Sequence, residues 1–123
     1  DAVLEVGTGT GSLTGLMADK AGCVLSVEVD HDFHRLAHEI VGRRPNVHLH
    51  YGDALARKNE LSPTVMAGWD ELAGQFGCTR RKLVANLPYV VATPVVSNLL
   101  LGDRPVERMV VMVQWEIAER LRA

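Results

Sequence analysis

Short apolar segments alternate along the chain with segments whose apolar residues recur at helical spacing, and this alternation is the strongest constraint on the fold. Five strands are expected, at residues 2–6, 24–29, 47–51, 82–86 and 107–113. Helices are expected at residues 12–20, 30–41, 93–101 and 115–123, with a short one near 70–76. Strands that alternate with helices predict a mostly parallel sheet with helices on both faces, an α/β fold. Ligands of such folds bind at the carboxyl ends of the strands.

Three sequence signals predict where individual elements begin. Ser12 is a candidate N-cap for the first helix, and Thr93 followed by Pro94 predicts a helix that begins at that pair. The Ser62-Pro63 pair predicts a turn within residues 58–77, the segment whose structure is hardest to predict.

The length and composition indicate one globular domain. The chain has 123 residues, of which 47% are hydrophobic and 23% charged, and no apolar run approaches the roughly 20 residues that span a bilayer. Cys23 and Cys78 fit neither a disulfide framework nor a zinc site, so we expect reduced thiols in a cytoplasmic, monomeric protein. The chain begins almost within a strand and ends within a predicted helix, so we expect residues 1–123 to be part of a larger protein.

A glycine-rich segment follows the first predicted strand, in the sequence Glu5-Val6-Gly7-Thr8-Gly9-Thr10-Gly11. Glycines here let the backbone turn tightly and approach a ligand closely. The nicotinamide fingerprint is G-x-G-x-x-G, but this segment reads G-x-G-x-G because Ser12 stands three residues after Gly9. An acidic residue before G-x-G-x-G is instead typical of enzymes that bind S-adenosylmethionine. A tight strand-to-helix turn without a ligand is the alternative.

Two further carboxylates follow predicted strands. Glu28 ends the second strand, where a carboxylate can accept hydrogen bonds from both ribose hydroxyls of a nucleoside, and Asp30 is the alternative for this role. Asp53 follows the third strand and could accept from an adenine amino group, although a turn aspartate is the plainer explanation.

The segment Asn86-Leu87-Pro88-Tyr89 follows the fourth predicted strand and suits chemistry at an adenine amino group. That nitrogen is a poor nucleophile, because its lone pair is delocalised into the ring. The Asn86 side-chain oxygen and the Leu87 carbonyl can accept from its two N–H bonds and so favour a pyramidal nitrogen. Pro88 restricts Leu87 to an extended conformation, and Tyr89 offers a face on which an extruded base can stack. An Asn-Pro turn with a packed tyrosine is the alternative.

The histidines offer no convincing metal site. His31, His34 and His38 share one face of the second predicted helix, but no acid or cysteine nearby completes a ligand set. We therefore expect no metal.

Taken together, these motifs resemble the small-subunit rRNA adenine N6-dimethyltransferases. The resemblance rests on VLEVGTGTGSLT, VEVD, GDAL, VANLPYVVATPVV and MVVMVQWEIAERL, and covers nearly the whole chain except residues 55–81. It implies a Rossmann-like fold that binds S-adenosylmethionine, truncated at both ends, and the dimethylation of adjacent adenosines in rRNA of the small ribosomal subunit or its precursor particle. The erythromycin-resistance rRNA methylases are close relatives of this family.

The resemblance also implies a role for each motif. Glu5 and the loop formed by Gly7, Thr8, Gly9 and Gly11 would hold the methionine part of the cofactor. Glu28 would hold the ribose, and Asp53 with Ala54 the adenine. The target base would lie against Asn86, Leu87, Pro88 and Tyr89, with Asn86 also contacting the cofactor.

The chain departs from the family at two positions and leaves one different function open. Family members usually have proline at the position of Thr8, and Lys or Arg at that of Trp115. The net charge of −2 is unusual for a dedicated nucleic-acid binder. Separately, a module that holds S-adenosylmethionine or RNA without chemistry is the alternative to an enzyme.

Overall fold

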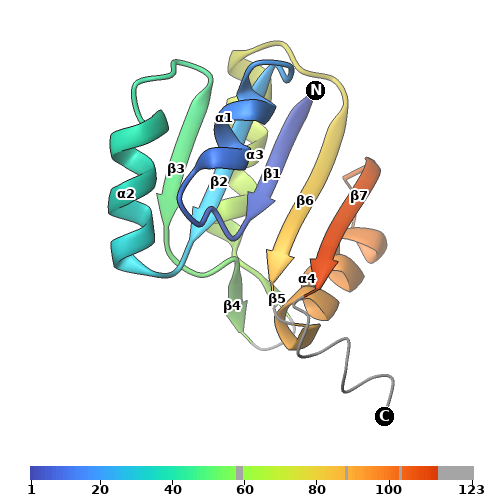
Figure 1. Cartoon of the computed structure of the whole chain (residues 1–123). Helices are drawn as coiled ribbons and strands as arrows, with labels where there is room; N and C mark the ends of the chain where they lie inside the picture. Colours follow the sequence, from blue (N-terminus) through green and yellow to red (C-terminus); the bar gives the residue numbers. More distant parts are fainter. Residues whose placement is uncertain (58–59, 88, 103, 114–123) are drawn as a thin grey trace.

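A five-stranded parallel sheet organises the computed structural model, which describes residues 1–57, 60–87, 89–102 and 104–113 (Figure 1). The strands lie in the order β3-β2-β1-β6-β7, and every pairing between them is parallel. Their bounds are Ala2–Val6 (β1), Cys23–Glu28 (β2), Val47–Tyr51 (β3), Arg81–Leu87 (β6) and Val106–Val113 (β7). The predicted α/β fold is confirmed, and the predicted strand bounds differ by at most one residue at either end.

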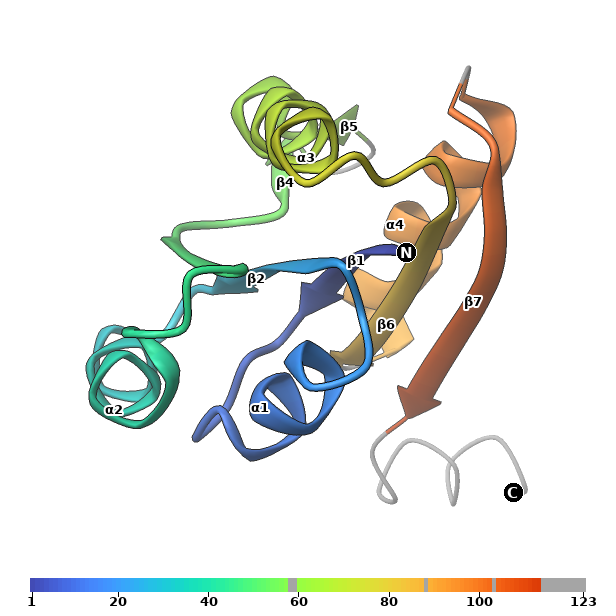
Figure 2. The same cartoon turned by 90° about the horizontal axis from the view of Figure 1, so that it is seen from above.

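Within the described residues, four helices cover the two faces of this sheet. They are α1 (Ser12–Ala18), α2 (His31–Val41), α3 (Pro63–Gln75) and α4 (Tyr89–Leu101). Viewed from above, α1 and α2 lie on one face and α3 and α4 on the other (Figure 2). The chain changes face after β3 and continues on the other side of β1. A switch point therefore lies between β1 and β6, and α/β folds bind ligands at such points.

The larger part of the core lies between the sheet and α3 with α4. Trp69 is fully buried there, among residues from β1, β2 and β6 such as Leu4, Leu25 and Leu83. The smaller core, under α1, contains Val3, Ala18 and Val24. The two layers bury β1 and β2 on both faces, which explains why these two strands read as mainly apolar runs.

The region expected to hold only a turn and a short helix contains more structure. A two-stranded antiparallel sheet pairs β4 (Leu55–Arg57) with β5 (Glu60–Leu61), and α3 begins at Pro63 rather than near residue 70. Ser62 caps α3, because its side chain accepts from the Val65 N–H. A serine cap with proline at the first helical position is therefore a helix start here, not the predicted turn.

The predicted cap of α1 and the predicted start of α4 are wrong. Ser12 is the first residue of α1, and the cap is Gly11 in a left-handed conformation with no side-chain hydrogen bond. The last described helix begins at Tyr89, which places Pro94 inside it rather than at its start. The buried residues Ala92, Val95 and Leu99 share one face across the proline, so packing against the sheet outweighs the missing N–H. The helix expected at 115–123 lies outside the described residues.

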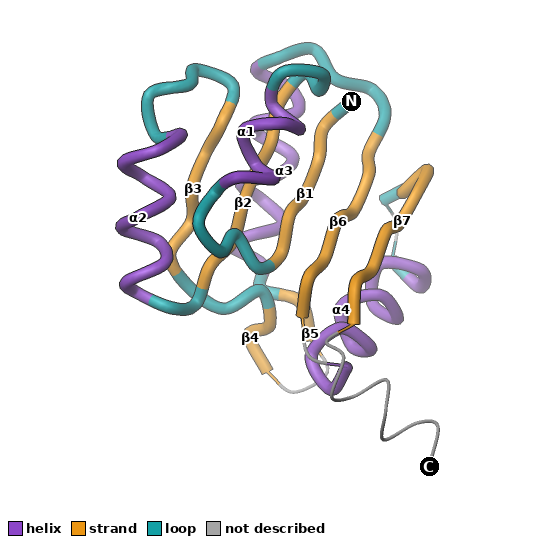
Figure 3. Tube along the Cα trace, viewed as in Figure 1, coloured by secondary structure: helices purple, strands orange, loops and turns teal. Residues whose placement is uncertain are grey.

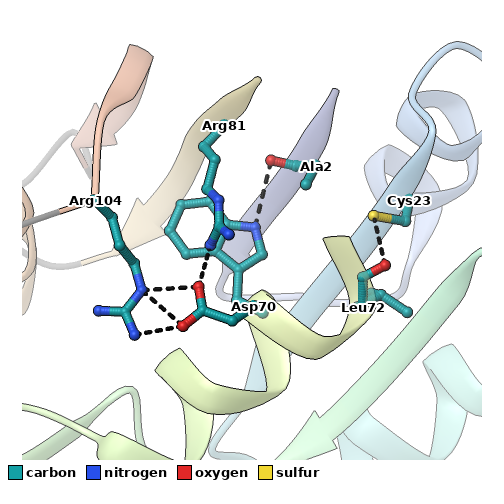
Figure 4. A network of polar contacts seen from close by, with 7 residues as sticks. Ala2, Cys23, Asp70, Leu72, Arg81 and Arg104 are labelled. Atoms are coloured by element: carbon teal, nitrogen blue, oxygen red, sulfur yellow. Dashed lines mark hydrogen bonds and ion pairs between the residues drawn. The ribbon is translucent and has the colours of Figure 1, made fainter. Parts of the chain in front are cut away.

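At the amino edge of the sheet, charged residues join α3 to β6 and to the turn before β7 (Figure 4). Asp70 accepts from Arg104 through both carboxylate oxygens, at 2.6 to 3.1 Å, and pairs with Arg81 at 2.5 Å. The Arg81 guanidinium also lies 5.0 Å from the Trp69 ring centroid. The Trp69 indole N–H donates to the Ala2 carbonyl, so this network fastens α3 to the starts of β1 and β6.

None of the described helices is long and apolar enough to cross a membrane. No group of three or more His, Cys, Asp or Glu side chains in the described part of the chain is placed to hold a metal ion.

Candidate functional site: a nucleoside-sized cavity at the carboxyl edge

The strands β1, β2 and β6 end at the carboxyl edge of the sheet, beside the loop into α1 (Figure 3). The described residues among those selected from the sequence gather at this edge. A cavity of about 240 Å³ opens there. Its lining comes from the ends of β1, β2 and β6, the β3–β4 turn and α4, and consists of Val6, Gly7, Val27, Glu28, Val29, Gly52, Asp53, Ala54, Leu55, Leu87 and Val91. Apolar walls with two carboxylates suit a flat, polar-edged ligand such as a nucleoside.

The glycine loop owes its shape to three left-handed residues. Gly7, Gly9 and Gly11 have φ of 92°, 58° and 90°. Gly7 faces a second constraint, since a Cβ there would lie 2.6 Å from the Asn86 carbonyl oxygen. The backbone of the loop therefore packs directly on the backbone of the Asn86 segment, which brings the two predicted motifs together.

Glu28 fixes this loop through its side chain. Its Oε1 accepts from the Gly9 N–H at 2.8 Å, and its Oε2 accepts from the Asp30 N–H at 3.0 Å. Each carboxylate oxygen keeps a further acceptor site, so Glu28 can hold the loop and still accept from a ligand. Asp30, the alternative candidate, is used differently: its side chain caps α2 by accepting from Asp32 and Phe33.

Asp53 and Ala54 also line the cavity. The Asp53 Oδ1 accepts from the Leu55 N–H at 2.9 Å, which makes Asp53 a turn residue, yet it also lines the cavity. The two explanations offered for Asp53 are therefore compatible. Ala54 is buried and packs into the main core, so only a small group presents to a ligand at this position.

Glu5 lies beneath the loop and is almost fully buried. Burial raises the pKa of its carboxyl; hydrogen bonds from Ser26 and Thr14 oppose that shift, and the charge of Glu28 adds to it. Both hydroxyls donate to the same oxygen, Oε1, that of Ser26 at 2.6 Å. Within the described part of the chain, neither Glu5 nor Glu28 forms an ion pair. Glu28 lines the cavity, whereas Glu5 is not part of its lining.

Thr8 and Asn86 differ in exposure, since the Thr8 side chain is buried and Asn86 is exposed. The Thr8 side chain is buried and meets Ser26, with the two hydroxyl oxygens 2.5 Å apart, so Thr8 can face a ligand only through its backbone. Asn86 is exposed at the end of β6, and Leu87 lines the cavity. Pro88 lies outside the described residues, and Tyr89 is described only as the first residue of α4.

Ser26 and Thr14 were not predicted from the sequence. Ser26 interrupts the otherwise apolar run of β2 and is fully buried, as is Thr14 in α1. A polar residue inside a strand expected to be buried on both faces is a signal for such a site, since a buried hydroxyl requires a partner.

A larger groove of about 480 Å³ lies on the α1 face, over β1, β6 and β7. It is lined mainly by apolar side chains, among them Met17, Val84 and Val110. None of the predicted site residues lines it, so the smaller cavity is the candidate site.

Comparison with known proteins identifies the family of this chain. Over residues 1–123 the chain matches the model of a family described as ribosomal RNA adenine dimethylase. It is 40% identical to the ribosomal RNA small subunit methyltransferase A of Rubrobacter xylanophilus and 36% identical to that of Alkaliphilus oremlandii. All of the chain aligns in both cases, but it spans only 42% and 40% of these relatives.

Two solved structures of similar enzymes superpose on nearly all of this chain. A dimethyladenosine transferase from Plasmodium falciparum superposes with a TM-score of 0.67 at 25% identity, over 98% of this chain and 38% of the other. The 23S rRNA methyltransferase ErmE superposes with a TM-score of 0.63 at 27% identity, over 95% of this chain and 41% of the other. With a family match that runs from the first residue to the last, the chain belongs to the ribosomal RNA adenine dimethylase family.

Proposed function

We propose that this chain forms the catalytic core of an enzyme that transfers methyl groups from S-adenosylmethionine to the N6 nitrogen of adjacent adenosines in small-subunit rRNA. The observation that carries the proposal is the packing of Gly7 on the Asn86 carbonyl. It sets a nucleotide-type glycine loop directly beside the segment suited to an adenine amino group, at the rim of one cavity.

The residues present fit S-adenosylmethionine. The cofactor carries a sulfonium and an ammonium charge, and the site holds Glu5 and Glu28 without a described cationic partner. Glu28 would accept from the ribose hydroxyls, Asp53 from the adenine amino group, and the loop backbone would face the methionine part. When bound, the cofactor supplies an electrophilic methyl group.

The target adenine would be held by the chain's own acceptors. The Asn86 side-chain oxygen and the Leu87 carbonyl would accept from its two N6 N–H bonds, which leaves the nitrogen lone pair free to point toward the cofactor. No titrating base is required before attack, because the nitrogen becomes positively charged only afterwards. Pro88 would aim the Leu87 carbonyl and Tyr89 would stack on the base; both roles stay predictions from the sequence.

The experiment that tests this proposal compares Asn86→Ala with the unmutated chain. Calorimetry measures S-adenosylmethionine binding, and transfer of labelled methyl groups to small-subunit rRNA, naked or in precursor particles, measures catalysis. We expect Asn86→Ala to lose transfer by at least about 100-fold while the dissociation constant changes by less than about threefold. Binding of S-adenosylmethionine with no transfer by the unmutated chain would favour a module that binds without chemistry, and equal transfer by both proteins would remove Asn86 from the chemistry. Location in the cytoplasm and a monomeric state remain predictions from the sequence.

A second candidate function is methylation of an adenosine in 23S rRNA, which the similarity to ErmE favours. The same assay separates the two functions if large-subunit rRNA is offered in parallel. Transfer to small-subunit rRNA alone supports the first function, and transfer to 23S rRNA alone supports the second.

A further inference from the structure

Ser26 places a hydroxyl group in the middle of β2, a strand that is buried along its whole length. Its Oγ lies 2.6 Å from Glu5 Oε1 and 2.5 Å from Thr8 Oγ1. A buried hydroxyl is costly unless it is hydrogen-bonded, so both contacts matter for its retention. Ser26 thus connects the acid at the end of β1 with the one side chain that stands between Gly7 and Gly9.

The directions of these hydrogen bonds follow from the chemistry of the groups. While Glu5 is ionised it can only accept, so Ser26 donates its proton to Glu5. The Ser26 oxygen is then an acceptor for the Thr8 hydroxyl, and the order is Thr8 to Ser26 to Glu5. Thr14 donates to the same Glu5 oxygen but touches no residue of the Gly7–Gly9 segment in this network.

Holding Thr8 in this way restrains the loop as a whole. Thr8 stands between two glycines with positive φ, and its carbonyl accepts from the Gly11 N–H at 3.1 Å. The next residue, Gly9, donates its N–H to Glu28. The loop is therefore tied at two adjacent residues, by Thr8 through Ser26 to Glu5 and by Gly9 to Glu28.

We propose that Ser26 is a positioning residue of the cofactor site, whose hydroxyl fixes Thr8 and with it the conformation of the glycine loop that receives S-adenosylmethionine. The inference rests on the proposed function insofar as it names the ligand. The restraint on the loop is a property of the ligand-free chain, so it can be tested separately.

A double-mutant cycle with Ser26→Ala and Thr8→Val tests the connection. Ser26→Ala leaves the buried Thr8 hydroxyl without its acceptor, and we expect the dissociation constant for S-adenosylmethionine to rise about tenfold. Thr8→Val removes that hydroxyl with little change of shape. The double variant should bind no more weakly than Ser26→Ala alone, so the two effects should not add.

Thr14→Val is the matched control, because it also removes one donor from Glu5 Oε1 but leaves Thr8 untouched. Its effect on affinity should add to that of Thr8→Val. Additive effects in the Ser26–Thr8 pair as well would overturn the proposal. Thermal unfolding of each variant shows that loss of affinity is not loss of folding.

The pH dependence of binding supplies a readout that a merely structural serine would not change. The Ser26 hydrogen bond lowers the pKa of Glu5, against the raising effects of burial and of the charge on Glu28. Without Ser26 the pKa of Glu5 rises further, so the acid limb of the affinity profile should move to higher pH in Ser26→Ala. It should stay in place in Thr8→Val, and an unmoved limb in Ser26→Ala would contradict the proposal.

Amide hydrogen exchange separates failure of this inference from failure of the proposed function. In the ligand-free chain, the Gly9 and Gly11 amides should exchange at least about tenfold faster in Ser26→Ala than in Thr14→Val. If the unmutated chain binds no S-adenosylmethionine but this difference appears, the cofactor assignment fails and the positioning role stands. Equal exchange in the two variants overturns the positioning role, whatever the ligand.

Discussion

Two carboxylates at opposite edges of the sheet, Glu5 and Asp70, differ in every respect that decides the use of a charge. Glu5 is buried at the carboxyl edge and meets only neutral hydroxyls, and burial raises its pKa. Asp70 is 40% exposed at the amino edge and meets two arginines, chiefly Arg104, which hold its pKa down to about 2. Within the described residues, Glu5 therefore has no cationic partner, whereas two arginines neutralise the charge of Asp70.

We infer from this difference that Glu5 belongs to the proposed ligand site and that Asp70 makes a structural contact. A buried carboxylate without a cation is costly to the folded protein, and it is retained where a ligand can supply the missing positive charge. A carboxylate with two arginines has no such need, and its contacts join α3 to the rest of the fold. Exchanging each acid for its amide should therefore have opposite consequences.

Glu5→Gln should produce the largest change, a loss of S-adenosylmethionine affinity of about 100-fold. The amide keeps an oxygen for Ser26 and Thr14 but removes the charge that would face a cationic ligand. The same change should raise the free energy of unfolding at pH 7 by about 1 kcal/mol, because no buried charge has to be desolvated. Calorimetry and urea unfolding measure the two effects, and unchanged affinity would remove Glu5 from the cofactor site.

Asp70→Asn should instead lower the stability of the protein and leave its affinity for S-adenosylmethionine nearly unchanged. Arg81 is only 18% exposed on its side chain and would lose its carboxylate, as would Arg104. We expect the free energy of unfolding to fall by about 2 kcal/mol, between the values for exposed and buried ion pairs. Affinity for S-adenosylmethionine should stay within about twofold of the unmutated chain, and a larger change would mean that the two edges of the sheet are coupled.

The sequence predicted the parts of the fold and site that depend on local pattern. Strands buried on both faces read as apolar runs, and α2 has its apolar residues at helical spacing, so both were predicted closely. The same local signal failed at the two serine- or threonine-proline pairs: Ser62-Pro63 starts a helix and Thr93-Pro94 lies inside one. Local propensity does not contain the packing of Ala92 and Val95 on the sheet, which decides the second case.

The site shows the same division. Glu28 was predicted from its place at a strand end, and the structure puts it beside the glycine loop. Ser26 and Thr14 were missed because their role depends on three elements meeting around one carboxylate oxygen. The spacing of residues along the chain does not show which elements come together around Glu5. The polar residue within an apolar strand indicates only that Ser26 has a buried partner.

Stability as a function of pH should distinguish the two acids by sign. The pKa of Asp70 is lowered from 3.8 to about 2, so its contribution is present above pH 3.8 and is lost as the pH falls toward 2. Solvent screening keeps this contribution modest, since Asp70 is 40% exposed. Glu5 acts oppositely: its pKa is raised from 4.5, so the stability from its bound proton is present below pH 4.5 and is lost as the pH rises through the folded value.

Urea unfolding between pH 2 and 7 measures this, with each amide variant as the control for its own acid. The difference between the unmutated chain and Asp70→Asn should shrink below pH 3.8, and that for Glu5→Gln should grow above pH 4.5. Curves that keep a constant separation at all pH values would contradict the assigned environments.

The smallest effects should come from two glycines that differ in backbone conformation but not in space. A Cβ added at Gly9 or at Gly74 would meet no atom within 4 Å. Gly9 has a φ of 58°, whereas Gly74 lies in the last turn of α3 without a positive φ. Gly9→Ala should therefore lower the free energy of unfolding by about 1 kcal/mol, and Gly74→Ala should raise it by about 0.5 kcal/mol. Neither substitution creates a clash. An equal effect of the two in urea unfolding would therefore show that the left-handed conformation of Gly9 does not make alanine unfavourable there.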